Sequence, residues 1–479
     1  MAVYYNECIQ VCVVYGSKMQ GSASSHISRL SEFIVENNQC FFCNAFSSLK
    51  FISLIEQSRK LKSNGPTRIS PGVPVHLCRY MTWISSGNQL RRSHLSPRSR
   101  ISNNVQMDLY LKQEFTSFTG RSIYSSFKER GARNALLCLT PEQRKAGVVA
   151  ASAGNHAQGL SYHGQSLGIP VKVVMPVIAP LMKIQKCKDF GADVVVEGND
   201  MFGATQVALD DSRSSGRVFI NAFDNVRVMA GQGTIGLEIL DQLPNVDAVV
   251  IPIGGGGLIA GISTAIKARK PDTLIIGVES EMCPSFNEAQ IKGKPVVVPT
   301  GRSLADGLAV PQVGIHSFSN ATNKIDRMVI VKEDSIALAI LTLVEKEKSV
   351  VEGAGAVSMA AILSGQLDLL KGKRVVLVVS GGNIDTTVLS RALHKGMAMD
   401  GRLLKVGVVV DDRPGCIAEL CQVFSQLQVN MRHLMHERAW VKADVFSVKL
   451  PEIGRRAHLT PSQPPHYGLG ADKAVVYNK

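Results

Sequence analysis

The chain has 479 residues, of which 45% are hydrophobic and 19% are charged, and its formal net charge is +14 at pH 7. This composition excludes a mainly disordered protein and leaves room for two or three domains. Nine lysines and arginines, with no Asp or Glu among them, lie between residues 57 and 107. We therefore expect a flexible basic segment and no nucleic-acid partner. No apolar run has the length needed to cross a bilayer, so we expect no membrane partner either.

Residues 1–100 show no sustained periodicity and carry loop-like clusters such as Ser70-Pro71-Gly72, so we expect an irregular N-terminal extension there. The 10 cysteines are spread through a chain whose start lacks the pattern of a secretory signal. This favours a reducing compartment. We expect the cytoplasm, with the mitochondrion as the alternative.

Residues 101–400 carry short β-branched apolar runs that alternate with helical patterns, which is typical of parallel α/β units. The expected strands are Val148–Ala151, Val171–Met175, Val194–Val196, Val218–Ile220, Val246–Ile253, Leu274–Val278 and Arg374–Val379. The expected helices include Ala179–Phe190, Gly233–Leu243, Leu258–Ala268, Asp334–Glu347 and Asp385–Met397. This order predicts an α/β fold with doubly wound parallel sheets in two lobes, the smaller one at about residues 147–216.

The pattern changes after Gly401, where a strand at Leu403–Val410 and a helix at Ile417–Leu427 are followed by strands at Asn430–Trp440 and Asp444–Leu450. We expect a separate small α+β module at residues 402–450. The tail at residues 451–479 is expected to be unstructured.

Four consecutive glycines, Gly254, Gly255, Gly256 and Gly257, lie between an expected strand and an expected helix. Their backbone amides and the helix N-terminus can converge on a phosphate. Gly255, Gly257 and Ala260, with Glu279 nineteen residues later, also fit a dinucleotide-binding pattern. A phosphate-bearing cofactor and a nicotinamide cofactor, the latter in an oxidoreductase, therefore both stay open at this point.

Lys128 and Asn155 favour the first of these alternatives. A lysine amine can condense with an aldehyde cofactor, and an asparagine can hydrogen-bond its ring hydroxyl. Four motifs occur in order: SFKERGARNA at residues 126–135, ASAGNHAQG at residues 151–159, the glycine loop, and SGGN at residues 380–383. Together they closely resemble fold type II (tryptophan synthase β-like) pyridoxal phosphate enzymes, specifically the threonine/serine dehydratase and serine racemase family.

The resemblance implies a role for each matching residue, with pyridoxal 5'-phosphate as the cofactor. Lys128 matches the Schiff-base lysine, Phe127 the residue packed beside the cofactor, and Asn155 the partner of the ring hydroxyl. Gly254 to Gly257 match the phosphate-binding loop and Ser380 the partner of the pyridine nitrogen. The residues that match the substrate pocket are Ser152, Ala153, Gly154, His156 and Gly307, with Asp306 and Glu352 nearby.

The resemblance also implies the reaction. Threonine would give 2-oxobutanoate and ammonia, and serine would give pyruvate and ammonia, by elimination of water. Racemases of this family place a serine hydroxyl on the far side of the substrate, where this chain has Ala153, which has no proton to give. The sequence therefore favours a dehydratase over a serine racemase, and it implies an amino-acid substrate and a homo-oligomer, a dimer or a tetramer.

The chain departs from the family pattern at a metal site, at an insertion and at a truncated C-terminal module, and the last two leave a catalytically impaired member as a further alternative. The racemase-like metal site maps to Glu279, Cys283 and Ser285, and because a hydroxyl replaces its last carboxylate we expect no metal. Residues 121–125 are inserted before the lysine motif. Residues 402–450 resemble only part of an ACT regulatory domain. A catalytic region of this family followed by an ACT-like module points to the biodegradative type of threonine dehydratase.

Overall fold

The computed structural model describes residues 6–14, 93–115, 126–411 and 414–438. The chain divides into two compact units, one of residues 68–396 and one of residues 1–67 together with 397–479. Among the described residues, the larger unit contains two sheets and nearly all of the helices, and the smaller unit contains one sheet and one whole helix.

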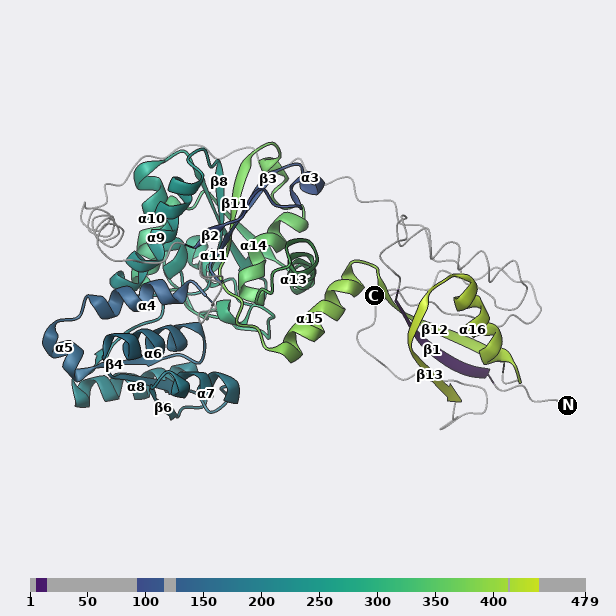
Figure 1. Ribbon diagram of the computed structural model, residues 1–479, viewed down its shortest axis with the longest axis horizontal. Coiled ribbons are helices and arrows are strands. Elements are labelled where there is room, and N and C mark those ends of the chain that lie inside the picture. Colours follow the sequence, from purple (N-terminus) through teal and green to yellow (C-terminus); the bar gives the residue numbers. More distant parts are fainter. Residues whose placement is uncertain (1–5, 15–92, 116–125, 412–413, 439–479) are drawn as a thin grey trace. The chain divides into compact units, whose positions relative to one another are not determined.

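The first sheet of the larger unit has six strands in the order β10-β9-β8-β11-β3-β2 (Figure 1). Its strands are β2 (His94–Leu95), β3 (Asp108–Gln113), β8 (Ala248–Pro252), β9 (Leu274–Ser280), β10 (Arg327–Val331) and β11 (Arg374–Val379). Every pairing is parallel except that of the short edge strand β2 with β3. Parallel strands end at the same edge, so the loops that follow β8 and β11 can meet there.

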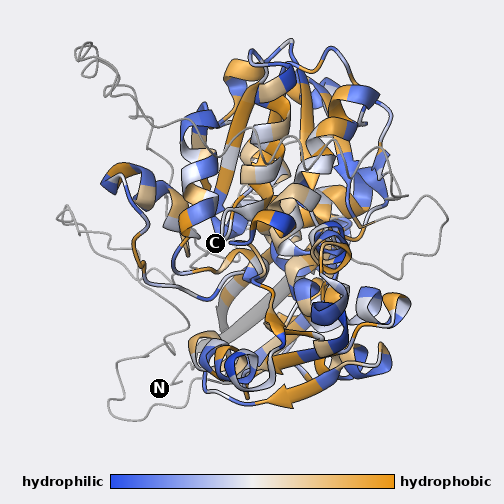
Figure 2. Cartoon of the chain, turned by 90° about the vertical axis from the view of Figure 1, so that its left-hand side faces the viewer, coloured by the Kyte–Doolittle hydropathy of each residue, from blue (hydrophilic) through white to orange (hydrophobic). Residues whose placement is uncertain are grey.

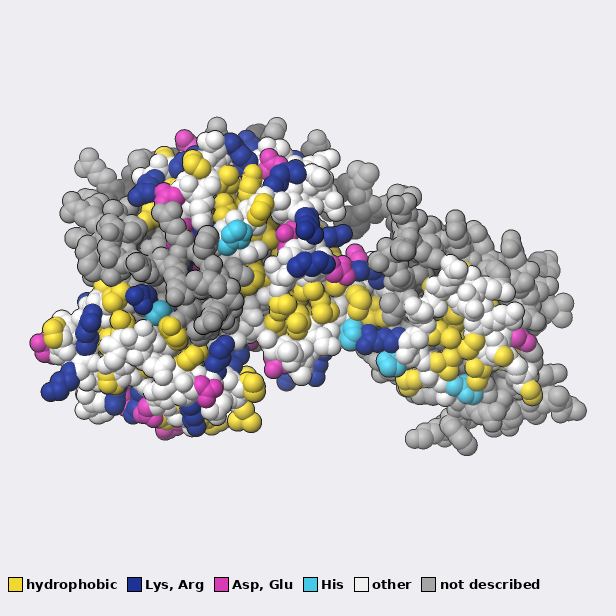
Figure 3. Space-filling model, viewed as in Figure 1, with side chains coloured by type: hydrophobic (Ala, Val, Ile, Leu, Met, Phe, Trp, Pro, Cys, Tyr) yellow, Lys and Arg dark blue, Asp and Glu magenta, His cyan; other side chains and the backbone are white. Residues whose placement is uncertain are grey.

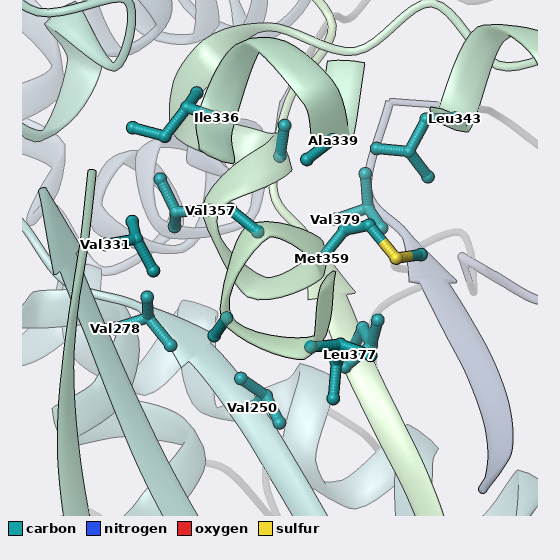
Figure 4. Close-up of a cluster of buried hydrophobic side chains, with 14 of the residues drawn as sticks. Val250, Val278, Val331, Ile336, Ala339, Leu343, Val357, Met359, Leu377 and Val379 are labelled. Atoms are coloured by element: carbon teal, nitrogen blue, oxygen red, sulfur yellow. The ribbon is translucent and has the colours of Figure 1, made fainter. Parts of the chain in front are cut away.

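Helices cover both faces of this sheet because its strands are apolar on both sides. On one face, α13 (Glu333–Glu347) and α14 (Gly353–Leu363) pack onto the strands, and Figure 4 shows Val357 and Met359 of α14 above Val250 and Leu377. On the other face, α9 (Val226–Gln242) and α10 (Gly257–Arg269) bury their apolar side chains. Hydropathy follows this layering, with orange strands inside and blue residues on the outer sides of helices (Figure 2).

The second sheet has four parallel strands in the order β6-β5-β4-β7, formed by β4 (Val148–Ala151), β5 (Val171–Met175), β6 (Asp193–Val196) and β7 (Val218–Phe219). Residues of α4 (Lys128–Leu137) and α6 (Asn155–Leu167) pack on one face and α8 (Met201–Ser215) on the other. This confirms the expected α/β class and its doubly wound parallel sheets. We call the layers around the six-stranded and four-stranded sheets the large lobe and the small lobe.

The remaining helices of this unit connect these elements. They are α3 (Ser102–Val105), α5 (Pro141–Ala146), α7 (Leu181–Asp189), α11 (Ser285–Lys292), α12 (Ile315–Ala321) and α15 (Thr386–Met399), with single 3₁₀ turns at Asp306–Leu308, Thr322–Lys324 and Asp368–Leu370. Within the described ranges, no helix is both long enough and apolar enough to span a membrane.

Core elements without a counterpart among the predicted ones include β3, β10 and α14. The helix α14 is rich in Gly and Ala and is buried nearly all round, so its sequence lacks the three-to-four periodicity on which the prediction depended. The strand β10 is short and has an exposed Arg327 and partly exposed residues at its outer edge, so it lacks a long apolar run. The expected helix at Gly233 is the second part of α9, which begins at Val226 because Asn225 caps it through the amides of Arg227 and Val228.

The smaller unit contains β12 (Leu403–Asp411), α16 (Cys416–Gln426) and β13 (Asn430–Arg438), close to the predicted strand-helix-strand order. Its sheet has a third strand, β1 (Asn6–Val14), which lies between β12 and β13 and is antiparallel to both. The N-terminal residues 6–14 thus differ from the irregular extension that we expected, because their partners lie some 400 residues further along the chain. The predicted strand Asp444–Leu450 and the expected tail lie outside the described residues.

Candidate active site

Lys128 is the first residue of α4, beside the carboxyl end of β11. The Phe127 amide donates a hydrogen bond to the Ser380 carbonyl at 3.0 Å, and Ser126 forms a β-bridge with Gly381. The Lys128 ammonium donates to the Ala222 carbonyl at 2.8 Å and lies 5.2 Å from the centre of the Phe127 ring. The structure therefore brings three of the predicted residues, Phe127, Lys128 and Ser380, together.

The electrostatic surroundings of Lys128 favour a neutral amine. Burial lowers the pKa of Lys128 to about 8, although the negative charge of Glu352 acts in the opposite direction. The uncharged fraction of this amine near neutral pH is therefore larger than that of an ordinary lysine, and the uncharged form is the one that acts as a nucleophile or a base.

The glycine loop joins β8 to α10, and close contacts on both sides exclude side chains from it. A Cβ at Gly255 would lie 2.2 Å from the Phe223 ring, and one at Gly257 would lie 2.5 Å from the Phe223 carbonyl oxygen. Gly256 has φ +91°, a left-handed conformation that favours glycine. Gly254 approaches the turn at Gly307 and Leu308. The amides of this loop and the free amides of the first turn of α10 suit an anion.

The loop Ser152 to Asn155 joins β4 to α6 in the small lobe. The Ser152 amide donates to the Val174 carbonyl at 3.1 Å, so it is engaged within the sheet, while the Ser152 hydroxyl accepts a hydrogen bond from the Gly154 amide at 3.3 Å. The amides at the start of α6, from Asn155 and His156, have no intrahelical partner by position. This helix N-terminus suits a carboxylate.

The His156 side chain lies inside the small lobe. It is 2% exposed, and its Nε2 is 3.1 Å from the Ile220 carbonyl, to which it donates as the neutral tautomer. Burial, and secondly the charge of Lys128, lowers the pKa of His156 to about 3. The imidazole is therefore neutral, and what His156 offers at the loop is its backbone amide.

Asn155 lies in a hydrogen-bonded group with Glu352 and Asn383. The Asn155 amide nitrogen donates to the Glu352 carboxylate at 2.9 and 3.2 Å, and the Asn155 carbonyl oxygen accepts from the Asn383 side chain at 2.8 Å. The Glu352 carboxylate also accepts from the Asn383 amide at 3.2 Å. Burial raises the pKa of Glu352 to about 7, although its bond to Asn155 acts in the opposite direction.

Gly307 lies in an exposed turn close to Glu352, since a Cβ at Gly307 would be 4.0 Å from the Glu352 carboxylate. The neighbouring Asp306 is 3.5 Å from the Lys183 ammonium of α7. Asn155 and Lys183 of the small lobe thus contact Glu352 and Asp306, which lie close together in the large lobe.

Glu279 has a structural role that explains its place in the sequence pattern. Its carboxylate is fully buried and accepts hydrogen bonds from the amides of Phe286 at 2.8 Å and Asn287 at 2.9 Å. Both oxygens therefore bind the start of α11, and the carboxylate is not free to bind a ribose. Among the described residues, no group of three or more His, Cys, Asp or Glu side chains could hold a metal ion.

Two residues of the site carried no strong signal in the sequence. Ala222 and Phe223 follow β7 and contact the lysine and the glycine loop, but single apolar residues in a loop have no distinguishing pattern. Asn383 belongs to the predicted motif at residues 380–383, and its bond to Asn155 joins positions 228 residues apart.

The comparisons with known proteins agree with this geometry. A family model described as "Pyridoxal-phosphate dependent enzyme" matches residues 88–381. An L-threonine ammonia-lyase of Thermotoga maritima is 45% identical over 363 residues, which is 76% of this chain and 89% of that protein. A catabolic L-threonine dehydratase of Staphylococcus aureus is 40% identical over 312 residues, which is 64% of this chain and 88% of that protein.

Two solved structures are similar over most of their length. The processed form of threonine deaminase isoform 2 from Solanum lycopersicum matches with a TM-score of 0.64 and 36% identity, covering 70% of this chain and 97% of that one. Maize serine racemase matches with a TM-score of 0.61 and 28% identity, covering 67% of this chain and 96% of that one. The nicotinamide alternative is therefore wrong, and the chain belongs to the family of pyridoxal-phosphate dependent enzymes.

Proposed function

We propose that this chain deaminates L-threonine to 2-oxobutanoate and ammonia, and L-serine to pyruvate and ammonia. The reaction eliminates water across the Cα–Cβ bond and takes water up again when the C–N bond is hydrolysed, so atoms balance without an oxidant or a reductant. The observation that carries the proposal is the buried Lys128 amine, with a pKa of about 8, beside Phe127 and Ser380. The ammonia-lyase and dehydratase names of the relatives support the same reaction.

The residues around Lys128 suit pyridoxal 5'-phosphate. Lys128 would hold it covalently, and Ser380 would face its pyridine nitrogen. Asn155 would donate to its ring hydroxyl with the amide nitrogen that donates to Glu352 in this structure. The amides of Gly254, Gly255, Gly256 and Gly257 would hold its phosphate, because the loop has no side chains to keep an anion away. When bound, this cofactor supplies an electron sink that lowers the barrier to loss of the substrate Cα proton.

The chain supplies the proton transfer and the orientation of the substrate. The Lys128 Nζ, uncharged in part near neutral pH, is suited to take the Cα proton. The start of α6, with the amides of Asn155 and His156 and the Ser152 hydroxyl, would bind the substrate carboxylate. Gly307 leaves room for the substrate next to Glu352.

Ala153 favours elimination over racemisation. Racemisation needs a second acid that returns a proton to Cα from the face opposite Lys128, and the methyl group of Ala153 has none. The Ala153 side chain is only partly buried, at the margin of the apolar core of the small lobe. We therefore expect little or no D-serine from L-serine.

The experiment incubates the holoenzyme separately with L-threonine, L-serine and their D-isomers, and measures ammonia, 2-oxo acid and D-amino acid. We expect 2-oxo acid and ammonia in equal amounts. Borohydride reduction followed by peptide mapping should place the cofactor on Lys128. Lys128→Ala should lose both the label and the activity, whereas Lys145→Ala, at an exposed position of α5, should keep both. A label on another lysine would overturn the proposal.

The finer expectations on partners and location rest on sequence and composition. In Figure 3, Lys and Arg side chains are interspersed with Asp and Glu on the face in view, which supports the absence of a nucleic-acid partner. We propose a homo-oligomer, a dimer or a tetramer, which sedimentation equilibrium would test. We also propose the cytoplasm, with the mitochondrion as the alternative, which cell fractionation would distinguish.

A further inference from the structure

A buried group of four charged side chains lies behind the first turn of α4. This four-charge cluster consists of Lys112 of β3, Glu114 just after β3, Arg130 of α4 and Glu238 of α9. Their side chains are at most 9% exposed. Two cations and two anions balance, so the cluster has no net charge and none of its members stays unpaired in the interior.

Arg130 lies at the centre of the cluster, and each of its five N–H groups has an acceptor. It binds Glu114 through Nε at 2.7 Å and Nη2 at 3.2 Å, and Glu238 through Nη1 at 2.6 Å and Nη2 at 2.9 Å. The remaining Nη1 proton points to the Thr234 hydroxyl at 2.9 Å. A guanidinium held by two carboxylates in this way tolerates little rotation or sliding of its helix.

Lys112 completes the cluster from the sheet. Its ammonium donates to Glu238 at 2.7 Å, Gln242 at 2.8 Å and the Ser93 carbonyl at 3.0 Å. Although burial acts against ionisation, Arg130 and Lys112 hold the pKa of Glu238 at about 2. Glu238 is therefore ionised at neutral pH. The cluster connects a strand of the large sheet with both α9 and α4.

The cluster also joins the two ends of the segment that precedes Lys128. Glu114 comes before residues 116–125 and Arg130 follows them, so the Glu114–Arg130 pair brings the chain together across that segment. The backbone does the same, because the Glu114 amide donates to the Val379 carbonyl and the Phe127 amide to the Ser380 carbonyl, both at 3.0 Å. The chain leaves and returns at neighbouring residues of β11, so the length of the segment need not affect Lys128.

Helix geometry couples the cluster to the amine. Lys128 and Arg130 are two residues apart in α4, so their side chains leave the helix about 200° from each other. Lys128 therefore points to the candidate active site, and Arg130 points to the four-charge cluster on the opposite side of α4. On the side of α9, Gly131 fits so closely that a Cβ would lie 2.4 Å from the Gln232 side chain, which leaves α4 little room to shift.

We propose that the four-charge cluster, acting through Arg130 as a positioning residue, sets the place of the Lys128 amine independently of the inserted residues 121–125. The inference rests on the proposed role of Lys128. An apolar core of the same volume could stabilise α4 equally well, since buried ion pairs are often no more stabilising than apolar replacements. The directional hydrogen bonds of the Arg130 guanidinium also fix the rotation of α4 about its axis. This rotation sets the direction in which the Lys128 amine points, which a reacting group requires.

The test uses Arg130→Lys, which keeps the positive charge and loses the fork that binds two carboxylates. In the cofactor-free protein, the pKa of Lys128 is measured from the pH dependence of its acylation by acetic anhydride, with the modified peptide identified by mass spectrometry. We expect this pKa to rise from about 8 toward 10.5 as the amine leaves its buried place. With cofactor added, kcat for L-threonine should fall by about a hundredfold.

Two controls separate positioning from general loss of stability. Asp211→Asn removes the partner that Lys172 binds at 2.7 Å in the small lobe, and should leave the pKa of Lys128 unchanged and kcat within about threefold. Deletion of residues 121–125 should also leave both unchanged. A shift of the Lys128 pKa on deletion alone, or a folded Arg130→Lys protein with unchanged pKa and kcat, would overturn the inference.

If Arg130→Lys does not fold, Glu114→Gln replaces it, and the same changes in the Lys128 pKa and in kcat are expected. This variant keeps the shape of the side chain and removes its negative charge. The pKa measurement needs neither cofactor nor substrate. A wild-type protein that lacks deaminase activity, but whose Lys128 pKa depends on Arg130, would therefore sink the proposed function and leave the positioning role intact.

Discussion

Asn155 of the small lobe donates hydrogen bonds to both carboxylate oxygens of Glu352 in the large lobe, at 2.9 and 3.2 Å. This contact holds the Asn155 side chain in one orientation, with its carbonyl oxygen toward Asn383. It also places a buried carboxylate near Lys128, whose pKa responds to the charge of Glu352.

Glu352→Gln should lower the pKa of Lys128 below its value of about 8 in the cofactor-free protein. A nearby negative charge stabilises the ammonium form, so its removal leaves burial as the dominant influence and makes the amine easier to deprotonate. The pH dependence of Lys128 acylation measures this shift. Glu129→Gln is the matched control, because Glu129 adjoins Lys128 in sequence and pairs with His163 at 3.5 Å. An equal shift in both variants would contradict the assignment.

Ala153→Ser should introduce racemase activity, because a hydroxyl at this position can return a proton to Cα. We expect D-serine formation from L-serine to rise at least about tenfold over the wild type, while dehydration continues. Chiral chromatography of the reaction mixture measures the D-isomer. Ala146→Ser, at the end of α5, should form no more D-serine than the wild type. Absence of D-serine in the Ala153→Ser protein would argue against the proposed place of Ala153.

Gly255→Ala and Gly257→Ala should both weaken cofactor binding, by about tenfold or more, but for different reasons. The new Cβ at residue 255 meets the Phe223 ring at 2.2 Å, whereas the one at residue 257 meets the Phe223 carbonyl oxygen at 2.5 Å. Adding Phe223→Ala should therefore restore affinity to Gly255→Ala and not to Gly257→Ala. Titration of the cofactor absorbance measures both.

Gly301→Ala is the control for these variants, since its new Cβ would meet only the flexible end of the Met282 side chain. Its affinity for the cofactor should equal that of the wild type. Equal rescue of both glycine variants by Phe223→Ala would show that the backbone contact at Gly257 is not limiting.

Glu279 should make the protein less stable as the pH rises. Burial raises its pKa to about 8 from the ordinary value of 4.5, although the amides of Phe286 and Asn287 act in the opposite direction. The folded state therefore retains a proton that the unfolded state has lost, and this contribution is fully present below pH 4.5 and is lost as the pH rises toward 8. The free energy of unfolding should fall across this window less steeply in Glu279→Gln than in the wild type. Parallel curves from urea unfolding at several pH values would contradict this.

Much of the fold could be predicted because its signals are local. The strands β4, β5 and β11 begin and end where their apolar β-branched runs do. The glycine loop lies between β8 and α10 as expected, because an apolar run before it and a helical pattern after it mark its two ends. The helix α14 escaped prediction because a helix that is buried all round has no polar face to reveal its period.

The candidate site shows the same difference between local signals in the sequence and contacts between distant residues. The sequence by itself determined the family, the cofactor and the residue types, because four motifs in order leave few alternative chemistries. Only the tertiary structure decided which groups meet: Asn155 with Glu352, 197 residues apart, and Arg130 with Glu238, 108 residues apart. It also decided that the Ser152 amide is engaged by Val174 and that strand β1 pairs with β12 and β13. Such contacts depend on how buried surfaces pack, and neither spacing nor periodicity along the chain encodes the partner of a charged side chain in the interior.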